Sequence, residues 1–281
     1  MGTGLLLSSF YSSAQKLIKV PYINEEWSND ETPFRIAGNL YYVGTYDLAS
    51  YLITTPQGHI LINTGLANSV PMIRKSVEQL GFNFGDIKIL LCTHAHYDHV
   101  GGMAAIKKIT GAKMMVSEGD AGVLADGGNS DYLMGGKGSL FYPVSADRLL
   151  HDHDTIRIGG MQVIALSHPG HTKGATSFLF DVKDEQRSYK VLIANMPTIL
   201  DDVKAGMPTY PAVAKDFAYT LGAMKKLKFD IFLSSHASQF GLHQKHKAGD
   251  AYNPMAFAGR EKYDEEMEDL QKKYHERFNK K

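Results

Sequence analysis

One stretch of this sequence decides how the rest is interpreted: Leu90-Leu91-Cys92-Thr93-His94-Ala95-His96-Tyr97-Asp98-His99-Val100-Gly101-Gly102. It begins at the end of an apolar run, Ile87–Leu91, which predicts a buried strand. On an extended backbone His94 and His96 point to the same side, because side chains alternate between the two faces of a strand. Asp98 and His99 follow where the chain turns. These four side chains exceed what one tetrahedral ion needs, so we expect two metal ions rather than a polar strand end without metal.

The composition is that of an ordinary globular protein, with 281 residues of which 43% are hydrophobic and 21% are charged. This length provides material for one large core and no Pro- or Ser-rich linker divides it, so we expect a single domain over residues 15–281. Lys plus Arg and Asp plus Glu balance at 30 each, which argues against a nucleic-acid partner. No apolar run has transmembrane length, which argues against a membrane partner. We expect a monomer.

The first residues resemble the end of a secretory signal. Residues 5–15 combine a short apolar run with small residues before Gln15. We therefore expect residues 1–14 to be a signal-peptide remnant or a disordered arm, and the protein to be exported to the periplasm.

Strands and helices follow one another twice along the chain, which predicts an α/β sandwich of two sheets with helices outside. Strands are expected at 34–38, 40–43, 49–54, 59–62, 87–91, 114–116, 155–158, 161–166, 175–180, 189–193 and 231–234. Helices are expected at 70–80, from the ligand stretch through 106 to Gly111, at 212–227 and at 263–278. Residues 126–145 are rich in Gly and lack periodicity, which is typical of a long functional loop.

Two further histidines occupy the same kind of position as His94, at the exit of a buried strand. His171 lies in a Gly- and Pro-bounded loop after the strand 161–166, and His236 follows the strand 231–234. Because a sheet delivers strand ends to a common edge, we expect both side chains near His94. In the loop of His171, His168 is the alternative ligand, but we expect it to pack instead.

The remaining candidates are interpreted as non-ligands. His151 and His153 imitate a metal motif but lie in a polar turn before a strand, so we expect them at the surface. No clustering distinguishes His59, His243, His246 and His275. The single cysteine, Cys92, would share a face with His94 and invites a role as ligand or nucleophile. We expect a buried strand residue, because a free Cys often behaves as a small hydrophobe.

The H-x-H-x-D-H pattern, the later Gly170-His171-Thr172 and the strand-end His236 resemble the metallo-β-lactamase superfamily. Four segments resemble its subclass B3 more narrowly, especially the GOB-type branch: Phe34-Arg35-Ile36-Ala37-Gly38-Asn39-Leu40-Tyr41-Tyr42-Val43-Gly44-Thr45, His168-Pro169-Gly170-His171-Thr172-Lys173-Gly174, Val191-Leu192-Ile193-Ala194-Asn195-Met196-Pro197 and Ser235-His236-Ala237-Ser238-Gln239-Phe240. The likeness extends from about Tyr22 to the last helix. It implies an α/β fold, the αββα sandwich of that superfamily.

The resemblance implies a ligand set for each of two zinc ions (Zn2+). By that analogy the first zinc is bound by His94, His96 and His171, and the second by Asp98, His99 and His236. GOB-type enzymes carry Gln at the first ligand position, whereas this chain has His94, which restores a three-histidine site. Asn63 stands where much of the superfamily has Asp, and we expect it to support the ligand loop by hydrogen bonds.

The implied activity is hydrolysis of the β-lactam amide bond of penicillins, cephalosporins and carbapenems by a zinc-bound hydroxide, which confers antibiotic resistance. Asp98 would orient the hydroxide. Tyr22 and Thr198 match substrate-contacting positions of the subclass and would hold the carboxylate and core of the antibiotic. An apolar wall would be formed by Leu133, Met134 and Phe141, with packing inside their own loop as the alternative.

Three rival interpretations remain. Glyoxalase II-like thioesterases and lactonases share H-x-H-x-D-H but typically add a bridging Asp, where this chain reads Ala194-Asn195-Met196. A non-catalytic zinc protein would close each ion with four protein ligands, whereas three per ion leave room for water. A serine mechanism is suggested by Ser13-Ala14-Gln15-Lys16, an S-x-x-K match, but no K-T-G follows, so we interpret it as coincidence.

Overall fold

Two β-sheets form the centre of the structure, a computed structural model that describes residues 16–278. The first sheet has seven strands in sequential order: β1 (Phe34–Ala37), β2 (Leu40–Tyr42), β3 (Tyr51–Ile53), β4 (His59–Ile62), β5 (Ile87–Leu91), β6 (Lys113–Ser117) and β7 (Arg148–Leu150). The second has five, in the order β12 (Ile231–Ser234), β11 (Ser188–Ala194), β10 (Thr176–Lys183), β9 (Met161–Ser167) and β8 (Thr155–Ile158). The expected signal-like arm, residues 1–14, lies outside the described residues, as does Ser13.

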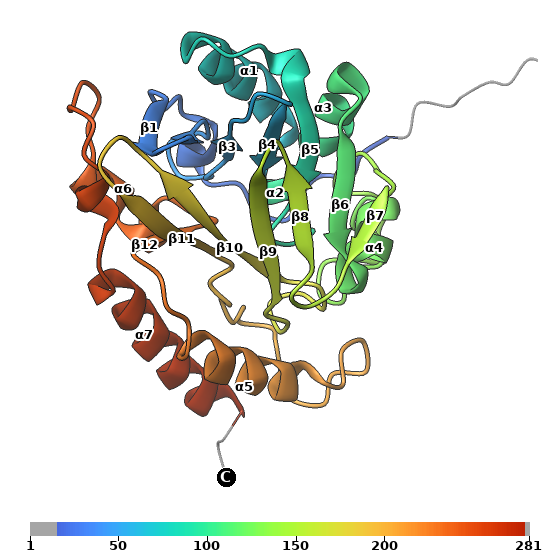
Figure 1. Ribbon diagram of the computed structural model, residues 1–281. Coiled ribbons are helices and arrows are strands. Elements are labelled where there is room, and N and C mark those ends of the chain that lie inside the picture. Colours follow the sequence, from blue (N-terminus) through green and yellow to red (C-terminus); the bar gives the residue numbers. More distant parts are fainter. Residues whose placement is uncertain (1–15, 279–281) are drawn as a thin grey trace, which may run out of the picture.

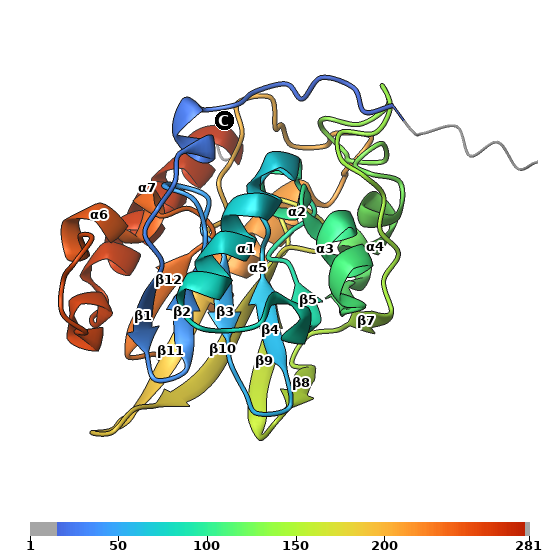
Figure 2. The same ribbon diagram turned by 90° about the horizontal axis from the view of Figure 1, so that it is seen from above.

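Helices cover the outer face of each sheet (Figures 1 and 2). They are α1 (Val70–Gln79), α2 (Tyr97–Val100), α3 (Met103–Thr110), α4 (Glu118–Ala125), α5 (Val213–Met224), α6 (Leu242–Lys245) and α7 (Glu261–Phe278). Figure 2 shows α1 and α3 side by side over the first sheet. On the opposite side, α5 and α7 cross the second sheet together, and the Tyr263 hydroxyl of α7 donates to the Met224 carbonyl of α5 at 2.8 Å.

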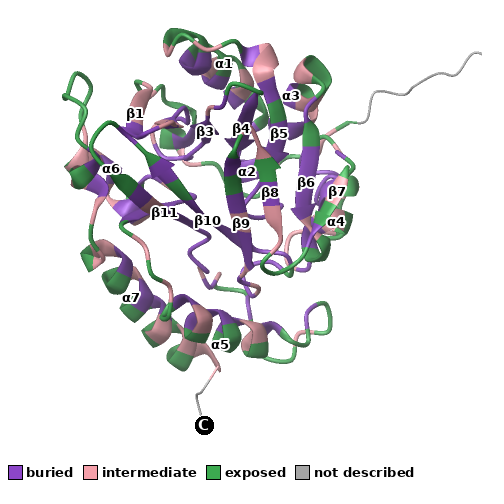
Figure 3. Cartoon of the chain, viewed as in Figure 1, coloured by how far each residue is buried: buried purple, intermediate pink, exposed green. Residues whose placement is uncertain are grey.

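The strands of the first sheet alternate between two cores because their side chains alternate in direction. Leu61 and Leu90 face the helices and pack in one apolar cluster with Ile73 of α1. Their neighbours Ile62 and Leu91 face the second sheet and belong to the larger cluster between the sheets. Figure 3 shows these central strands buried along most of their length. The predicted αββα sandwich is confirmed.

Three short elements, α4, α6 and β7, were not expected from the sequence. The helix α4 carries Gly119 and Gly122, and glycine disfavours a helix by about 1 kcal/mol relative to alanine, so the pattern gave no helical signal. Gly119 is needed there because a Cβ would lie 2.5 Å from the Lys173 carbonyl oxygen. The strand β7 has only three residues and is defined by its parallel pairing with β6, which no local pattern encodes.

The segment between α4 and β7 contains no regular helix or strand over residues 126–147, all of which are described. The expectation of a long loop at 126–145 is therefore confirmed, and we call residues 126–147 the cavity loop. Among the helices within residues 16–278, none combines the length and apolarity that a bilayer crossing requires.

Candidate metal centre

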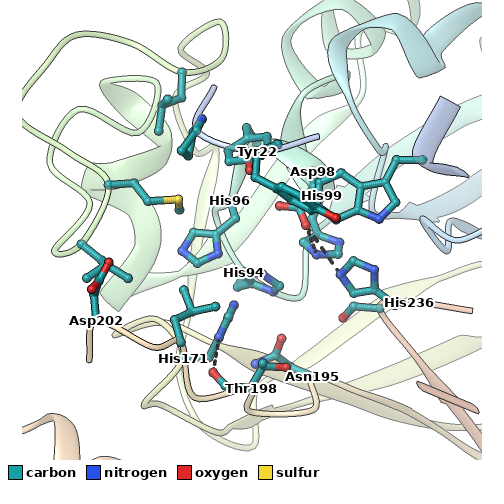
Figure 4. A pocket seen from close by; sticks show the side chains of 18 of the residues that line it. Tyr22, His94, His96, Asp98, His99, His171, Asn195, Thr198, Asp202 and His236 are labelled. Atoms are coloured by element: carbon teal, nitrogen blue, oxygen red, sulfur yellow. Dashed lines mark hydrogen bonds and ion pairs between the residues drawn. The ribbon is translucent and has the colours of Figure 1, made fainter. Parts of the chain in front are cut away.

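Six side chains that are far apart in sequence meet at one edge of the sandwich (Figure 4). The nitrogen atoms available for ligation on His94, His96 and His171 lie within 4.8 Å of one another. A second group, formed by His94, Asp98 and His99, satisfies the same limit.

His236 lies beside Asp98 of the second group, which makes Asp98, His99 and His236 a further set of three donors. Its Nε2 lies 3.6 Å from Asp98 Oδ2, and His99 Nε2 lies 3.1 Å from the same oxygen. Donor atoms around one tetrahedral ion with bonds of ~2.1 Å are about 3.4 Å apart, so these spacings suit a shared ion. The structure thus brings together all six residues proposed as ligands.

The end of β5 explains how four of the six are delivered. The strand is extended up to Leu91, and the chain continues through His94 and His96 before α2 begins at Tyr97. The single turn of α2 then carries Asp98 and His99. The other two come from the second sheet, since His171 follows β9 and His236 follows β12.

Three members of the cluster, His94, His171 and Asp98, favour the protonation state that binds a metal. Burial, followed by the neighbouring His99, holds the pKa of His94 well below its usual value, and burial lowers the pKa of His171 to about 3. Burial acts to raise the pKa of Asp98, but His99 and His236 lower it well below the usual range. Neutral imidazoles and an ionised carboxylate are the forms that bind metals. His94 Nε2 is moreover buried with no hydrogen-bond partner among residues 16–278, so a metal would satisfy it.

The second ring nitrogen of each histidine outside α2 is held by the protein. The Thr93 hydroxyl lies 3.2 Å from His94 Nδ1, and the Thr198 carbonyl oxygen lies 2.7 Å from His171 Nδ1. Such contacts fix the ring orientation and leave the other nitrogen for a ligand.

A carboxylate lies beside each of the two remaining rings. Asp131 Oδ2 lies 3.3 Å from His96 Nε2, and Asp47 Oδ2 lies 3.0 Å from His236 Nδ1. Burial acts to lower the pKa of His236, but Asp47 and Asp98 raise it to about 9.

Asn63 connects β4 to the ligand stretch. Its Oδ1 accepts the Thr93 backbone N–H at 2.9 Å, and its Nδ2 donates to the Thr93 hydroxyl at 3.1 Å. Its φ of 62° lies in the left-handed region, which Asn tolerates better than most residues. Asn63 therefore fixes the residue that precedes His94, in the manner expected for it.

A cavity of about 740 Å³ opens above the cluster. Tyr22, Thr198, Leu133 and Met134 all line it, as expected for substrate-contacting residues. The expectation for Phe141 is wrong, because its side chain is only 1% exposed and packs in the core beneath the cavity loop. The loop therefore turns this large apolar ring inward and presents the other two side chains.

Several residues of the site escaped sequence analysis. Buried Asp120 of α4 accepts the Ala95 N–H at 2.9 Å, the Thr172 hydroxyl at 2.8 Å and the Gly174 N–H at 2.8 Å, which ties the ligand stretch to the loop of His171. Asp47, Asp131 and Asn195 were missed as well. Asp47 and Asp131 stand alone in loops far from the motif, so no local signal marks them. Asn195 directly follows β11, and the strand-end rule that found His171 and His236 could have found it.

Asn195 is distinctive because it lines the cavity with an unsatisfied amide. It is 1% exposed, and neither its Oδ1 nor its Nδ2 has a hydrogen-bond partner in the described part of the chain. Figure 4 shows it near His94 and His236.

The histidines set aside from the sequence lie as expected. His168 is 2% exposed and packs with its Nδ1 2.7 Å from the Ser177 hydroxyl. The side chains of His151 and His153 are exposed by 62% and 75%. Cys92 is buried in the core of the first sheet, and burial raises its pKa well above the usual value, so its thiol is poorly suited to act as a nucleophile.

Comparison with known proteins agrees with this geometry. A family model described as the metallo-beta-lactamase superfamily matches residues 45–184. A hydroxyacylglutathione hydrolase from Rhodopseudomonas palustris is 28% identical over 135 residues, which are 48% of this chain and 44% of that protein. The chain thus matches less than half the length of this curated relative.

Solved structures match almost the whole chain. A beta-lactamase from Chitinophaga pinensis is 63% identical with a TM-score of 0.93, over 94% of this chain and 100% of the other. The class B3 di-zinc metallo-beta-lactamase LRA-12 from an Alaskan soil metagenome is 61% identical with a TM-score of 0.91, over 92% and 99%. The metallo-beta-lactamase GOB-18 from Elizabethkingia meningoseptica is 53% identical with a TM-score of 0.92, over 94% and 98%. On this likeness and on its cluster of buried histidines, the chain belongs to the class B3 metallo-β-lactamases.

Proposed function

We propose that this protein hydrolyses the amide bond of β-lactam antibiotics with two zinc ions. His94, His96 and His171 would hold the first ion, and Asp98, His99 and His236 the second. The observation that carries the proposal is the convergence of these six donors at the base of an open cavity. Three protein ligands per ion are typical of catalytic zinc, whereas structural zinc is closed by four.

When bound, zinc supplies Lewis-acid polarisation of a carbonyl group and a nucleophile at neutral pH. The protein's own residues do the rest. Asp98 carries the one carboxylate in the cluster, and its low pKa keeps it ionised, so it accepts a hydrogen bond from the attacking water and orients it.

The cavity supplies the groups that bind a substrate. Thr198 and Tyr22 offer hydroxyl groups to the carboxylate and core of the antibiotic, and Leu133 and Met134 offer an apolar wall to its side chain. The buried amide of Asn195 offers both a donor and an acceptor. A buried amide without partners costs about 1–3 kcal/mol per group, and a substrate with a carbonyl or amide group would recover this energy.

His94 favours occupancy of the first zinc site, and so a count of two ions per chain. In GOB-type enzymes the corresponding ligand is Gln, and here an imidazole replaces it. Imidazole is a stronger zinc ligand than a neutral amide oxygen, so the first site of this chain would retain zinc more tightly.

The deciding experiment measures hydrolysis of imipenem and of a penicillin by the purified protein, with and without EDTA, together with a zinc count. Hydrolysis that EDTA abolishes and zinc restores, with two ions per chain, is expected. Turnover of S-lactoylglutathione but of no β-lactam would reverse the assignment in favour of a thioesterase. Two bound zinc ions without hydrolysis of either class would identify a zinc-binding protein.

The proposal extends to the setting of the enzyme. Residues 15–281 would act as one domain, because both sheets contribute to the same core. We further propose a monomer exported to the periplasm, where β-lactams act. Size-exclusion chromatography and cell fractionation test these two points.

A further inference from the structure

Asp131 divides its two carboxylate oxygens between the cavity loop and a metal ligand. Oδ1 accepts the backbone N–H groups of Leu133 at 2.9 Å and of Met134 at 2.7 Å. Oδ2 lies 3.3 Å from His96 Nε2. The side chain of Asp131 is only 2% exposed, so both sets of contacts are made away from bulk water.

The turn that follows Asp131 is tightly constrained. The Gly135 N–H donates to the Asp131 carbonyl at 3.1 Å, and the Gly136 N–H donates to the Asn129 carbonyl at 2.7 Å. A Cβ on Gly135 would lie 2.4 Å from both the Asn129 and the Asp131 carbonyl oxygens. The turn therefore has little freedom to move unless Asp131 moves with it.

This turn carries the two residues of the apolar wall, Leu133 and Met134, which line the cavity. One carboxylate thus contacts a metal ligand on one side and caps the wall of the substrate cavity on the other. Besides the ligand Asp98, the other hydrogen-bond and ion-pair partners of the ligand histidine rings in residues 16–278 are Thr93 in the ligand stretch itself, the Thr198 carbonyl in the segment after β11, and Asp47 on the opposite side of the cluster. None of these three lies in the cavity loop or connects a ligand to it.

We propose that Asp131 is a positioning residue that couples metal occupancy at His96 to the order of the cavity loop. This inference rests on the proposed metal site. If His96 binds a metal through Nδ1, its Nε2 would carry the proton. This Nε2 is buried without a hydrogen-bond partner among residues 16–278, and the Asp131 carboxylate 3.3 Å away is the charged group placed to pair with it. Because the two oxygens belong to one rigid carboxylate, holding Oδ2 also holds Oδ1. Oδ1 in turn holds the N–H groups of Leu133 and Met134 in place. The coupling is reciprocal. A ligand that orders Leu133 and Met134 raises the metal affinity by the same factor by which the metal raises the affinity for that ligand.

The substitution Asp131→Asn separates the two halves of the contact. The amide oxygen still accepts the two N–H groups of the turn, whereas the NH2 group faces the His96 N–H, and two donors repel. Turning the amide around would satisfy His96 but oppose the two backbone N–H groups. The variant therefore breaks the connection between His96 and the turn. It keeps the size of the side chain and one of its two sets of contacts.

Asp126→Asn is a matched control in the same loop. Asp126 Oδ1 also accepts a backbone N–H of the loop, that of Ser130 at 3.2 Å, but among residues 16–278 no hydrogen bond or ion pair joins Asp126 to a histidine. Matching far-UV circular-dichroism spectra of the metal-free wild-type protein and both variants would establish that all three fold alike.

The test measures hydrogen exchange of the Leu133 and Met134 amides with and without zinc, and zinc affinity by competition with a chromophoric chelator. In the wild-type and Asp126→Asn proteins, zinc should slow this exchange. In Asp131→Asn the exchange should no longer respond to zinc, and zinc affinity should fall about 10–100-fold. Two results would overturn the proposal. One is hydrogen exchange of Leu133 and Met134 that zinc does not change in the wild-type protein, and the other is an Asp131→Asn protein with wild-type zinc affinity and a wild-type response of this exchange to zinc. Neither readout uses a β-lactam, so failure of the proposed activity is recognised separately.

Discussion

Asp47 and His236 are 189 residues apart in sequence, yet Asp47 Oδ2 lies 3.0 Å from His236 Nδ1 at the edge of the metal cluster. The same oxygen accepts the indole N–H of Trp27 at 3.2 Å, and Asp47 Oδ1 accepts the Ser238 N–H at 3.0 Å. The carboxylate therefore holds the ring and the backbone of the turn after β12 together, and it directs His236 Nε2 toward Asp98.

Asp47→Asn should weaken zinc binding at the second site about 10–100-fold, because the amide cannot fix the His236 ring as firmly as a carboxylate. The first site should keep its affinity, since His94, His96 and His171 do not contact Asp47. Zinc titration resolves the two steps. Equal loss at both sites would show that Asp47 acts through the fold rather than through His236.

Replacing His94 tests the first site directly. His94→Ala should bind zinc poorly at that site and hydrolyse β-lactams only at background rate, while the fold persists. His94→Gln, which carries the GOB-type residue, should lower the affinity of the first site with less loss of activity. His151→Ala is the control, because its side chain is exposed. A His94→Ala enzyme that works at full rate would contradict the ligand assignment.

Phe141 and Leu133 lie in the same loop but should respond differently. Phe141→Ala removes a buried core ring and should destabilise the protein by about 3–5 kcal/mol. Leu133→Ala should change the free energy of unfolding by less than about 1 kcal/mol and raise KM for substrates with apolar side chains. Denaturant unfolding together with steady-state kinetics distinguishes the two variants. A Phe141→Ala protein with a raised KM and unchanged stability would show that Phe141 lines the cavity.

His168 makes stability depend on pH. Burial lowers its pKa to about 4 from an ordinary value of 6.5, so the folded protein disfavours the charged ring. The unfolded chain binds the proton more readily, and the stability from neutral His168 is therefore fully present above pH 6.5 and is lost as the pH falls toward 4. The difference corresponds to about 3 kcal/mol.

His168→Asn keeps a polar partner for Ser177 but cannot titrate. In the metal-free protein, its unfolding free energy should fall less than that of wild type between pH 6.5 and 4. If the unfolding free energies of the two proteins fell equally with pH, His168 would not be the cause of the pH dependence.

Asn195→Ala should lower kcat/KM for β-lactams by roughly 10-fold, the equivalent of one hydrogen bond of ~1.4 kcal/mol. Zinc content should not change, because Asn195 is not placed as a ligand. A loss of zinc in this variant would instead show that the amide supports the metal site.

Local pattern was sufficient for the central strands, for the long helices and for the six candidate ligands. Apolar runs predicted β5 and β12, and H-x-H-x-D-H places four ligands within six residues of one another, where a turn after a strand leaves them little choice of position. The strand-end rule then added His171 and His236. The elements that were missed, α4, α6 and β7, are short and lack a periodic pattern of their own.

The sequence by itself determined the fold class and the chemical nature of the site, because periodicity and ligand spacing are properties of neighbouring residues. The tertiary structure alone decided which carboxylates lie beside the ligand rings, since Asp47 approaches His236 and Asp131 approaches His96 only after distant segments have packed together. It also decided that Phe141 faces the core while Leu133 and Met134 face the cavity. In a loop without periodicity, the direction of each side chain is set by the packing around it and not by its neighbours in sequence.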